Sequence, residues 1–366
     1  MVDGFPGATI LNMTRTYIRL AVLTGILATG TAVCTFAQGT MARPNPPSTT
    51  RDSNGNLKTA DTSSSSEAIA RGQVNLADGS VPVGLVKIHA VCAGTEKFIA
   101  VADSKGRFSF NPAVLSDIAD TKGCVLRASV EGYRSETKPL EEVKPNSNTK
   151  LGKILLQPIS SDTSGLTSQT AAQASKAAKK AYEKGLDEAA KQSWPEAKAS
   201  LLKATAAYPD YSEAWLSLGI LEQSAGENDD ARKSFAEAAR SDGKFAVPLV
   251  LIAGLDAARH DWQATVEHSQ KAIDLNPGAF PYAYELNALG NLNLGKADAV
   301  QKSAAEGLKI DTEHQYPELE YFLGIVLSVK HDTEASKHLQ AYIDQSPKGP
   351  NIPQAKKALE QLRAAH

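Results

Sequence analysis

Apolar side chains follow two different periods along this chain. Between residues 68 and 158 they alternate with polar side chains in short runs, and turn pairs such as Asp-Gly and Lys-Gly separate the runs. This pattern predicts a small all-β sandwich of about seven strands. Between residues 171 and 348 apolar and small residues recur at helical spacing, which predicts an all-α region. We therefore expect a multidomain protein, with residues 159–170 as a Ser- and Thr-rich linker that has little to dock it and residues 349–366 as a C-terminal capping helix.

The helical region contains an internal repeat. Pro209 and Pro277 lie 68 residues apart, which is twice 34. The most complete copy reads Trp215, Leu218-Gly219, Ala231, Phe235 and Ala238. This pattern resembles the tetratricopeptide repeat (TPR), a helix–turn–helix unit of 34 residues. The resemblance implies about five repeats that stack into a right-handed superhelical solenoid. It also implies that small residues in the first helix of each unit let the two helices touch, at Gly185, Gly219, Ala253, Gly290 and Gly324. A shortened turn leaves the register of the fourth copy open by one or two residues.

The β region resembles a known domain too. The segments that carry the likeness are Arg71–Val74, Asp78–Val83, Ala102–Phe108 and Ala128–Tyr133. They are similar to the carboxypeptidase regulatory-like domain, and that resemblance implies a transthyretin-like sandwich. It implies no peptidase, because zinc carboxypeptidases need His-x-x-Glu plus a distant histidine. The His-x-x-Glu spacing at residues 331–334 is interpreted as a polar turn between two helices.

The beginning of the chain has the pattern of an export signal. Arg15 and Arg19 precede the apolar run Leu20–Val33, which is short for a bilayer span, and small residues follow it. Residues 1–37 are therefore predicted to be a signal peptide that is cleaved after Ala37. Three alternatives stay open. They are lipid attachment at Cys34, a retained N-terminal anchor, and a start at Met13 instead of Met1.

Export would place the rest of the chain in the periplasm or outside the cell. Residues 38–67 hold few large apolar side chains and many Pro, Ser, Thr, Asn and Asp residues, so they are predicted to be a disordered linker. Cys92 and Cys124 then form an even pair, and strand alternation puts both on inward faces. We predict one disulfide between them. The alternative is two buried reduced cysteines.

Composition and motifs disfavour most enzyme classes. The 366 residues are 42% hydrophobic with a formal net charge of -2, which excludes collagen, a wholly disordered chain and a polytopic membrane protein. Neither half is basic enough for nucleic-acid binding. The sequence has no phosphate-cradling loop, dinucleotide fingerprint or nucleophile elbow, and Ser200 with Lys203 matches Ser-x-x-Lys only inside a packing helix. We expect no enzyme, no catalytic residue, no metal site and no cofactor.

The expected function is binding. In tetratricopeptide proteins the first helix of each unit lines a concave groove. That face maps onto Tyr182, Leu186, Leu216, Ile220, Val250, Tyr284, Asn287, Asn291, Tyr321 and Ile325. Some tetratricopeptide proteins hold the C-terminal carboxylate of a peptide with Lys, Arg and Asn side chains on this face, and here the basic residues for such a clamp are missing apart from Lys179 at the margin. We therefore predict a non-enzymatic exported scaffold that binds a neutral segment or helix of a partner protein, with low salt sensitivity. The sandwich would be an accessory binding or spacer module.

Two alternatives accompany this prediction. In the first alternative, some of the groove side chains pack between the repeat units and bind no partner. In the other, the protein is a carbohydrate- or cell-wall-binding envelope protein that binds polysaccharide through the sandwich. Contact with a membrane is expected only through the signal peptide.

Overall fold

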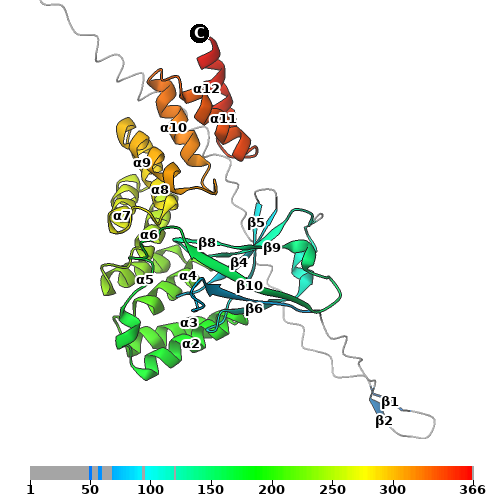
Figure 1. Cartoon of the computed structure of the whole chain (residues 1–366). Coiled ribbons are helices and arrows are strands. Elements are labelled where there is room, and N and C mark those ends of the chain that lie inside the picture. The colour runs from blue at the N-terminus through cyan, green and yellow to red at the C-terminus, as the bar shows by residue number, and fades with distance from the viewer. Residues whose placement is uncertain (1–48, 52–56, 60–67, 93–94, 119–120, 365–366) are drawn as a thin grey trace, which may run out of the picture.

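A computed structural model describes residues 49–51, 57–59, 68–92, 95–118 and 121–364 (Figure 1). The predicted signal peptide at residues 1–37 lies outside the described residues, as does most of the predicted linker at residues 38–67. Within that linker the structure describes two strands that pair antiparallel, β1 (Thr49–Arg51) and β2 (Leu57–Thr59).

The first domain is a sandwich of two four-stranded sheets. One sheet has the order β6-β3-β10-β8 and the other has the order β5-β4-β7-β9. Strands β3 and β10 pair in parallel, and the other neighbours in these sheets are antiparallel. The strands are β3 (Ala70–Leu76), β4 (Lys87–Cys92), β5 (Thr95–Val101), β6 (Arg107–Phe110), β7 (Val125–Ser129), β8 (Tyr133–Ser135), β9 (Thr137–Pro139) and β10 (Thr149–Pro158).

The alternating pattern of the sequence sets the two faces of each sheet. Ile88 of β4 lies opposite Ala128 of β7, and both are buried in the core between the sheets. The same strand phase brings Cys92, at the end of β4, to Cys124, which directly precedes β7. The structure joins these two residues in a disulfide.

The second domain is an all-α solenoid of paired helices in a tetratricopeptide-like arrangement. Five helix pairs are followed by one capping helix in the described residues (Figure 1). The helices are α2 (Lys176–Ala190), α3 (Trp194–Ala207), α4 (Ser212–Ser224), α5 (Asn228–Ser241), α6 (Val247–Ala258), α7 (Trp262–Leu275), α8 (Pro281–Asn293), α9 (Ala297–Ile310), α10 (Glu318–Val329), α11 (Ala335–Gln345) and α12 (Ile352–Ala364).

Small residues allow the two helices of a unit to touch. A Cβ added at Gly219 would lie 2.5 Å from the Phe235 ring of α5, and one at Gly185 would lie 2.8 Å from Leu201 of α3. A larger side chain at either position would have to push the second helix away. The predicted role of these two glycines is therefore visible in the packing.

The fourth unit has a different register from the predicted one. A Cβ at Gly290 would lie 2.7 Å from Val266, which belongs to α7 of the preceding unit. In the second unit, Gly219 precedes the first buried residue of the second helix by twelve positions. In the fourth unit the first buried residue of the second helix is Val300 of α9, and the residue twelve positions before it is Ala288. Both residues are fully buried. Assigning Gly290 to the within-unit contact was wrong, because this glycine lets α8 approach α7. By position, the small residue equivalent to Gly219 is Ala288.

Residues 159–170, which the sequence predicts to be a linker with few contacts, pack against the solenoid. Leu166 is 3% exposed and belongs to the main solenoid core. The side-chain amide of Asn276 donates to the carbonyl oxygens of Asp162 and Ser164, at 2.9 and 2.8 Å. The Asp242 carboxylate accepts from the Ser168 hydroxyl at 2.9 Å. The prediction that this segment makes few contacts with the folded domains is therefore wrong.

The side chains that hold this segment come from helix ends. Asp242 and Asn276 are the C-cap residues of α5 and α7, so their side chains project beyond the helices that precede them. Asp242 and Asn276 occupy equivalent positions in consecutive units. Asp242 accepts hydrogen bonds from residues 159–170, and Asn276 donates hydrogen bonds to them. The connection between the domains is fixed along the solenoid.

Candidate functional site

The β-sandwich is seated against the first helices of the solenoid units, the helices that line the concave face in such a superhelix (Figure 1). At the N-terminal end of this face, the backbone N–H of Gly84 donates to the Tyr182 hydroxyl at 3.1 Å. Gly84 has a φ of +87°, and an added Cβ would lie 3.3 Å from Leu216. The turn that precedes β4 therefore enters the groove at a position where only glycine fits well.

An apolar contact surrounds that hydrogen bond. Leu85 of the sandwich is 5% exposed and shares one hydrophobic cluster with Leu186 of α2 and Leu218 of α4. Beside the cluster lies a small cavity of about 90 Å³ between the sandwich turns and Ile220 and Leu251. Burial of side chains from both domains in one cluster is typical of a fixed domain interface.

The rim of this end is closed by polar and aromatic contacts. The backbone N–H of Ser104 donates to the Asp187 carboxylate of α2 at 3.0 Å. The rings of Phe98 and Trp194 have their centroids 6.3 Å apart. Both domains thus contribute side chains around the apolar centre.

At the far end the sandwich meets the loop between α9 and α10 through charged and polar groups. Arg134 donates to the Thr312 hydroxyl at 2.7 Å and lies 3.5 Å from the Glu313 carboxylate. Arg127 donates to the side-chain oxygen of Gln315 at 3.2 Å. These contacts border a cleft of about 410 Å³ between the domains.

Two half-buried carboxyls lie near this polar end. Burial raises the pKa of Glu131 in the sandwich to about 7, and the positive charge of Arg127 opposes that shift. Burial also raises the pKa of Glu285 on α8 to about 8, and the negative charges of Glu318 and Asp311 add to the rise. Glu285 therefore favours the neutral form at neutral pH, and Glu131 changes its charge near that pH.

The predicted groove residues divide into two sets. Those of the first two units, Tyr182, Leu186, Leu216 and Ile220, lie on the concave face and are covered by the sandwich. Those of the later units face other helices instead. This second set contains Val250, Tyr284, Asn287, Asn291, Tyr321 and Ile325, of which all but the half-buried Ile325 are less than 9% exposed.

Individual contacts explain the second set. Asn287 donates to the Ser269 hydroxyl of α7 at 3.1 Å and accepts from the Ser303 hydroxyl of α9 at 2.7 Å, and Asn291 donates to Asn287. Tyr321 packs its ring 5.3 Å from that of Tyr342. These side chains stabilise the solenoid and are not available to a partner, so the structure favours the packing alternative for them.

The two-residue shift in the fourth unit moves its concave positions. Counted from Ala288, they become Tyr282, Glu285 and Leu289. Tyr282 stacks on Tyr316 with ring centroids 5.8 Å apart, and burial raises its pKa, as do the charges of Glu285 and Glu131. These residues are hard to recognise in the sequence because Leu289-Gly290 resembles the Leu218-Gly219 pair of the second unit.

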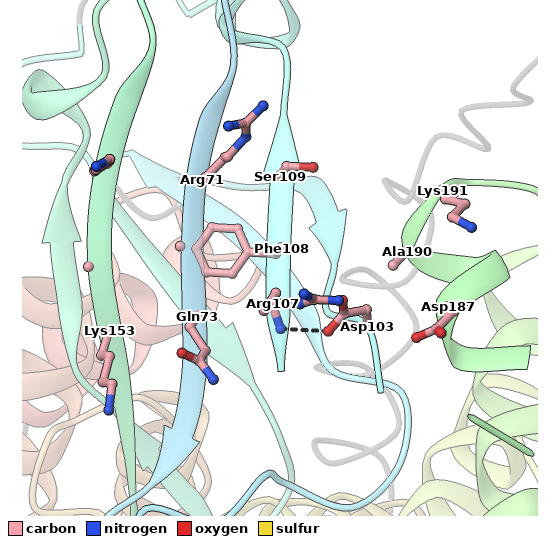
Figure 2. A pocket seen from close by; sticks show the side chains of 13 residues that line it. Arg71, Gln73, Asp103, Arg107, Phe108, Ser109, Lys153, Asp187, Ala190 and Lys191 are labelled. Atoms are coloured by element: carbon pink, nitrogen blue, oxygen red, sulfur yellow. Dashed lines mark hydrogen bonds and ion pairs between the residues drawn. The ribbon is translucent and has the colours of Figure 1, made fainter. Parts of the chain in front are cut away.

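A second surface lies next to the rim formed by Ser104 and Asp187. A cleft of about 680 Å³ separates the outer face of β3, β6 and β10 from the C-terminal end of α2 (Figure 2). Arg71, Arg107, Lys150, Lys153 and Lys191 line it. These five cations face two acids, Asp103 and Asp187.

The described residues contain few candidates for a catalytic or metal-binding site. There, no group of three His, Cys, Asp or Glu side chains is placed to hold a metal ion, and no helix has the length and apolarity needed to cross a membrane. His331 lies in the turn between α10 and α11, and Glu334 directly precedes α11. Ser200 donates to the Glu188 carboxylate of the neighbouring helix at 2.6 Å.

Comparisons with solved structures find proteins of low sequence identity. Neither a protein family nor a curated protein matches the chain. A MamA protein is 20% identical with a TM-score of 0.42, over 47% of this chain and 93% of that one. YrrB, described as a TPR protein with an unusual peptide-binding site, is 19% identical with a TM-score of 0.41, over 46% and 87%. PilF of Pseudomonas aeruginosa is 15% identical with a TM-score of 0.40, over 51% and 89%.

The class of protein therefore follows from this chain's own geometry. Its paired helices and their close glycine contacts define a tetratricopeptide-like solenoid. The first part of its concave face is covered by the β-sandwich that precedes it in the chain.

Proposed function

We propose that this chain is a non-enzymatic, exported scaffold whose solenoid binds protein surfaces through its concave face. One observation carries the proposal: the apolar first part of that face encloses a turn of a folded β domain, with Leu85 inserted between α2 and α4. A surface that buries such a turn has the shape and chemistry of a protein-binding groove.

The occupant of the groove defines how a partner would bind. Tyr182 and Leu216 are covered by the sandwich turn around Gly84, so a partner reaches them only when that turn leaves. We propose that the sandwich and the partner compete for the same positions. An incoming segment would replace one apolar side chain and one backbone donor.

Export is part of the proposal. It is supported by the leader pattern at residues 1–37 and by the disulfide, which is stable in an oxidising compartment. Intact mass of the protein purified from the cell envelope tests this part. A chain that starts after Ala37 with no free thiol is expected, and a chain that retains the leader or carries two free thiols would contradict it.

The competition is tested by photo-crosslinking in intact cells. A photoreactive residue at Gln223, which borders the cavity beneath the sandwich, is introduced into the wild type and into a Leu85→Asp variant that disfavours insertion of the turn. Val81→Asp is the matched control, because Val81 lies in the same loop and is 37% exposed. We expect adducts with a specific protein to increase several-fold in Leu85→Asp and to stay at the wild-type level in the control. Equal adducts in the two variants would contradict the competition.

A further inference from the structure

The outer face of the sandwich presents cations in register across three strands. In the pairing of β3 with β6 and β10, Arg71 lies between Ser109 and Lys150. Two residues further along, Gln73 lies between Arg107 and Lys153. Neighbouring strands are about 4.8 Å apart and side chains two residues apart share a face, so these six polar side chains form a compact grid.

Most of the positive charge in this grid is uncompensated. Arg107 pairs with Asp103 at 2.6 Å, and Asp187 accepts a hydrogen bond from the Ser104 backbone. In the described part of the chain, no acidic side chain pairs with Arg71, Lys150 or Lys153. Such a concentration of positive charge stands out in a chain with a net charge of -2.

The helical domain supplies the opposite wall. Lys191 stands at the C-terminal end of α2 across the cleft from the sheet, next to Ala190 (Figure 2). The volume of about 680 Å³ is that of a ligand of several linked units and far exceeds a single small anion. Docking of the sandwich on the solenoid therefore completes this cleft.

The lining indicates the chemistry of the ligand. Phe108 turns inward over Gly72 and is 3% exposed, so it offers no ring face for stacking a base or a neutral sugar. The Gln73 amide nitrogen donates to the Lys105 carbonyl, which leaves its oxygen as an acceptor for a hydroxyl. Ser109, which pairs with Arg71, adds a hydroxyl to the same face. Cations combined with hydroxyl-binding groups, without an apolar pocket for a peptide side chain, suit a polyhydroxylated anion.

We propose that this cleft binds an acidic polysaccharide. Arg71, Lys150 and Lys153 would contact carboxylates on successive sugars, and Lys191 would contact the polysaccharide from the α2 side of the cleft. The complete cleft, with Lys191, requires the docked sandwich, but its proposed ligand contacts are not groove positions, because Arg71, Lys150 and Lys153 do not line the cavity beneath the sandwich. Charge reversal at Lys150 and Lys153 therefore tests the cleft without changing a groove residue.

The test measures binding of the full-length chain to polygalacturonate by isothermal titration calorimetry at low salt, with a neutral glucan in parallel. The test variant is Lys150→Glu/Lys153→Glu. The matched control is Lys356→Glu/Lys357→Glu, which makes the same charge change at two exposed positions of α12. We expect at least a tenfold weaker affinity in the test variant, an affinity within twofold of wild type in the control, and no binding of the glucan.

Salt and two competing polyanions complete the experiment. Binding is expected to weaken by more than tenfold between 0.05 and 0.5 M salt, roughly as expected for several exposed ion pairs. Absence of polygalacturonate binding, or an equal loss in both double variants, would overturn the proposal. Tighter binding of polyglutamate or of single-stranded DNA than of polygalacturonate would also overturn it, since that result assigns the cleft to an acidic peptide or to a nucleic acid. Unchanged far-ultraviolet circular dichroism shows that each variant is folded.

Discussion

The two ends of the groove hold the same β-sandwich by different physical means. At the first end, Leu85 is inserted into an apolar cluster between α2 and α4, with one hydrogen bond from Gly84 to Tyr182. At the other end, Arg127 and Arg134 meet polar groups of the loop after α9. An apolar contact gains its free energy from surface removed from water, whereas exposed ion pairs contribute little and are screened by salt. The first end therefore supplies stability, and the second end makes the docking sensitive to pH and salt.

The largest effect is expected from Leu85→Ala. Removing a buried leucine side chain should lower the free energy of unfolding by about 2–4 kcal/mol, because a cavity remains between the domains. Val81→Ala, in the same loop but 37% exposed, should change it by less than about 0.5 kcal/mol. Urea unfolding followed by tryptophan fluorescence checks both. Equal effects of the two substitutions would mean that the sandwich turn is not inserted.

A medium effect is expected from pH at the second end. Glu131 and Glu285 have an ordinary pKa of 4.5, which the folded chain raises to about 7 and about 8. Between these values the folded state binds more protons than the unfolded state. The free energy of unfolding should therefore decrease as pH rises from about 5 to about 8.5.

The Glu131→Gln variant isolates one of these groups. It should reduce the decrease by about 1–2 kcal/mol, which is less than the whole shift implies because the side chain is half-buried. Glu142→Gln, at an exposed position of the same sandwich, should leave the pH profile unchanged. Urea unfolding at pH 5.5 and 8.5 provides the measurement. Identical profiles for wild type and Glu131→Gln would contradict burial of this carboxyl.

The smallest effect is expected from Arg134→Ala. Its contacts with Thr312 and Glu313 are partly exposed, so its loss should cost less than about 1 kcal/mol at low salt and close to nothing at 0.5 M salt. Lys144→Ala, at an exposed position of the sandwich, serves as control. A cost above 2 kcal/mol that persists at high salt would show that this end also contributes a buried contact.

Local patterns in the sequence were enough to predict much of the fold. Strand alternation indicated the sandwich and the phase of Cys92 and Cys124, and small residues at positions such as Gly219 indicated the helix pairs. Each of these features depends on spacing within a few tens of residues. The fold class follows from such short-range information.

The interface could not be predicted in the same way. Gly84 and Tyr182 lie 98 residues apart, and Gly84 looks like an ordinary turn residue. Asp242 and Asn276 look like ordinary helix caps, so their hold on residues 159–170 is invisible in the sequence. Nothing in one local pattern says that a domain will fold back onto the repeats that follow it.

The candidate sites show the same limit. In the first two units the predicted groove residues lie against the sandwich, an occupant that the sequence did not indicate. In the fourth unit Leu289-Gly290 imitates the consensus pair, so the prediction selected Asn287 and Asn291, which face neighbouring helices. The basic cleft was missed because Arg71 and Lys150 are distant in sequence and meet only through the parallel pairing of β3 with β10.

The seating of the sandwich in the concave face is tested most directly by an intramolecular crosslink. A photoreactive residue at Gln223 in the purified wild-type chain is illuminated, and the crosslinked peptides are identified by mass spectrometry. Because Gln223 borders the same cavity as Val83, Lys87 and Val130, we predict crosslinks to residues 83–87 or 129–131 within the same molecule. Crosslinks only to other parts of the solenoid, or only between molecules, would contradict it.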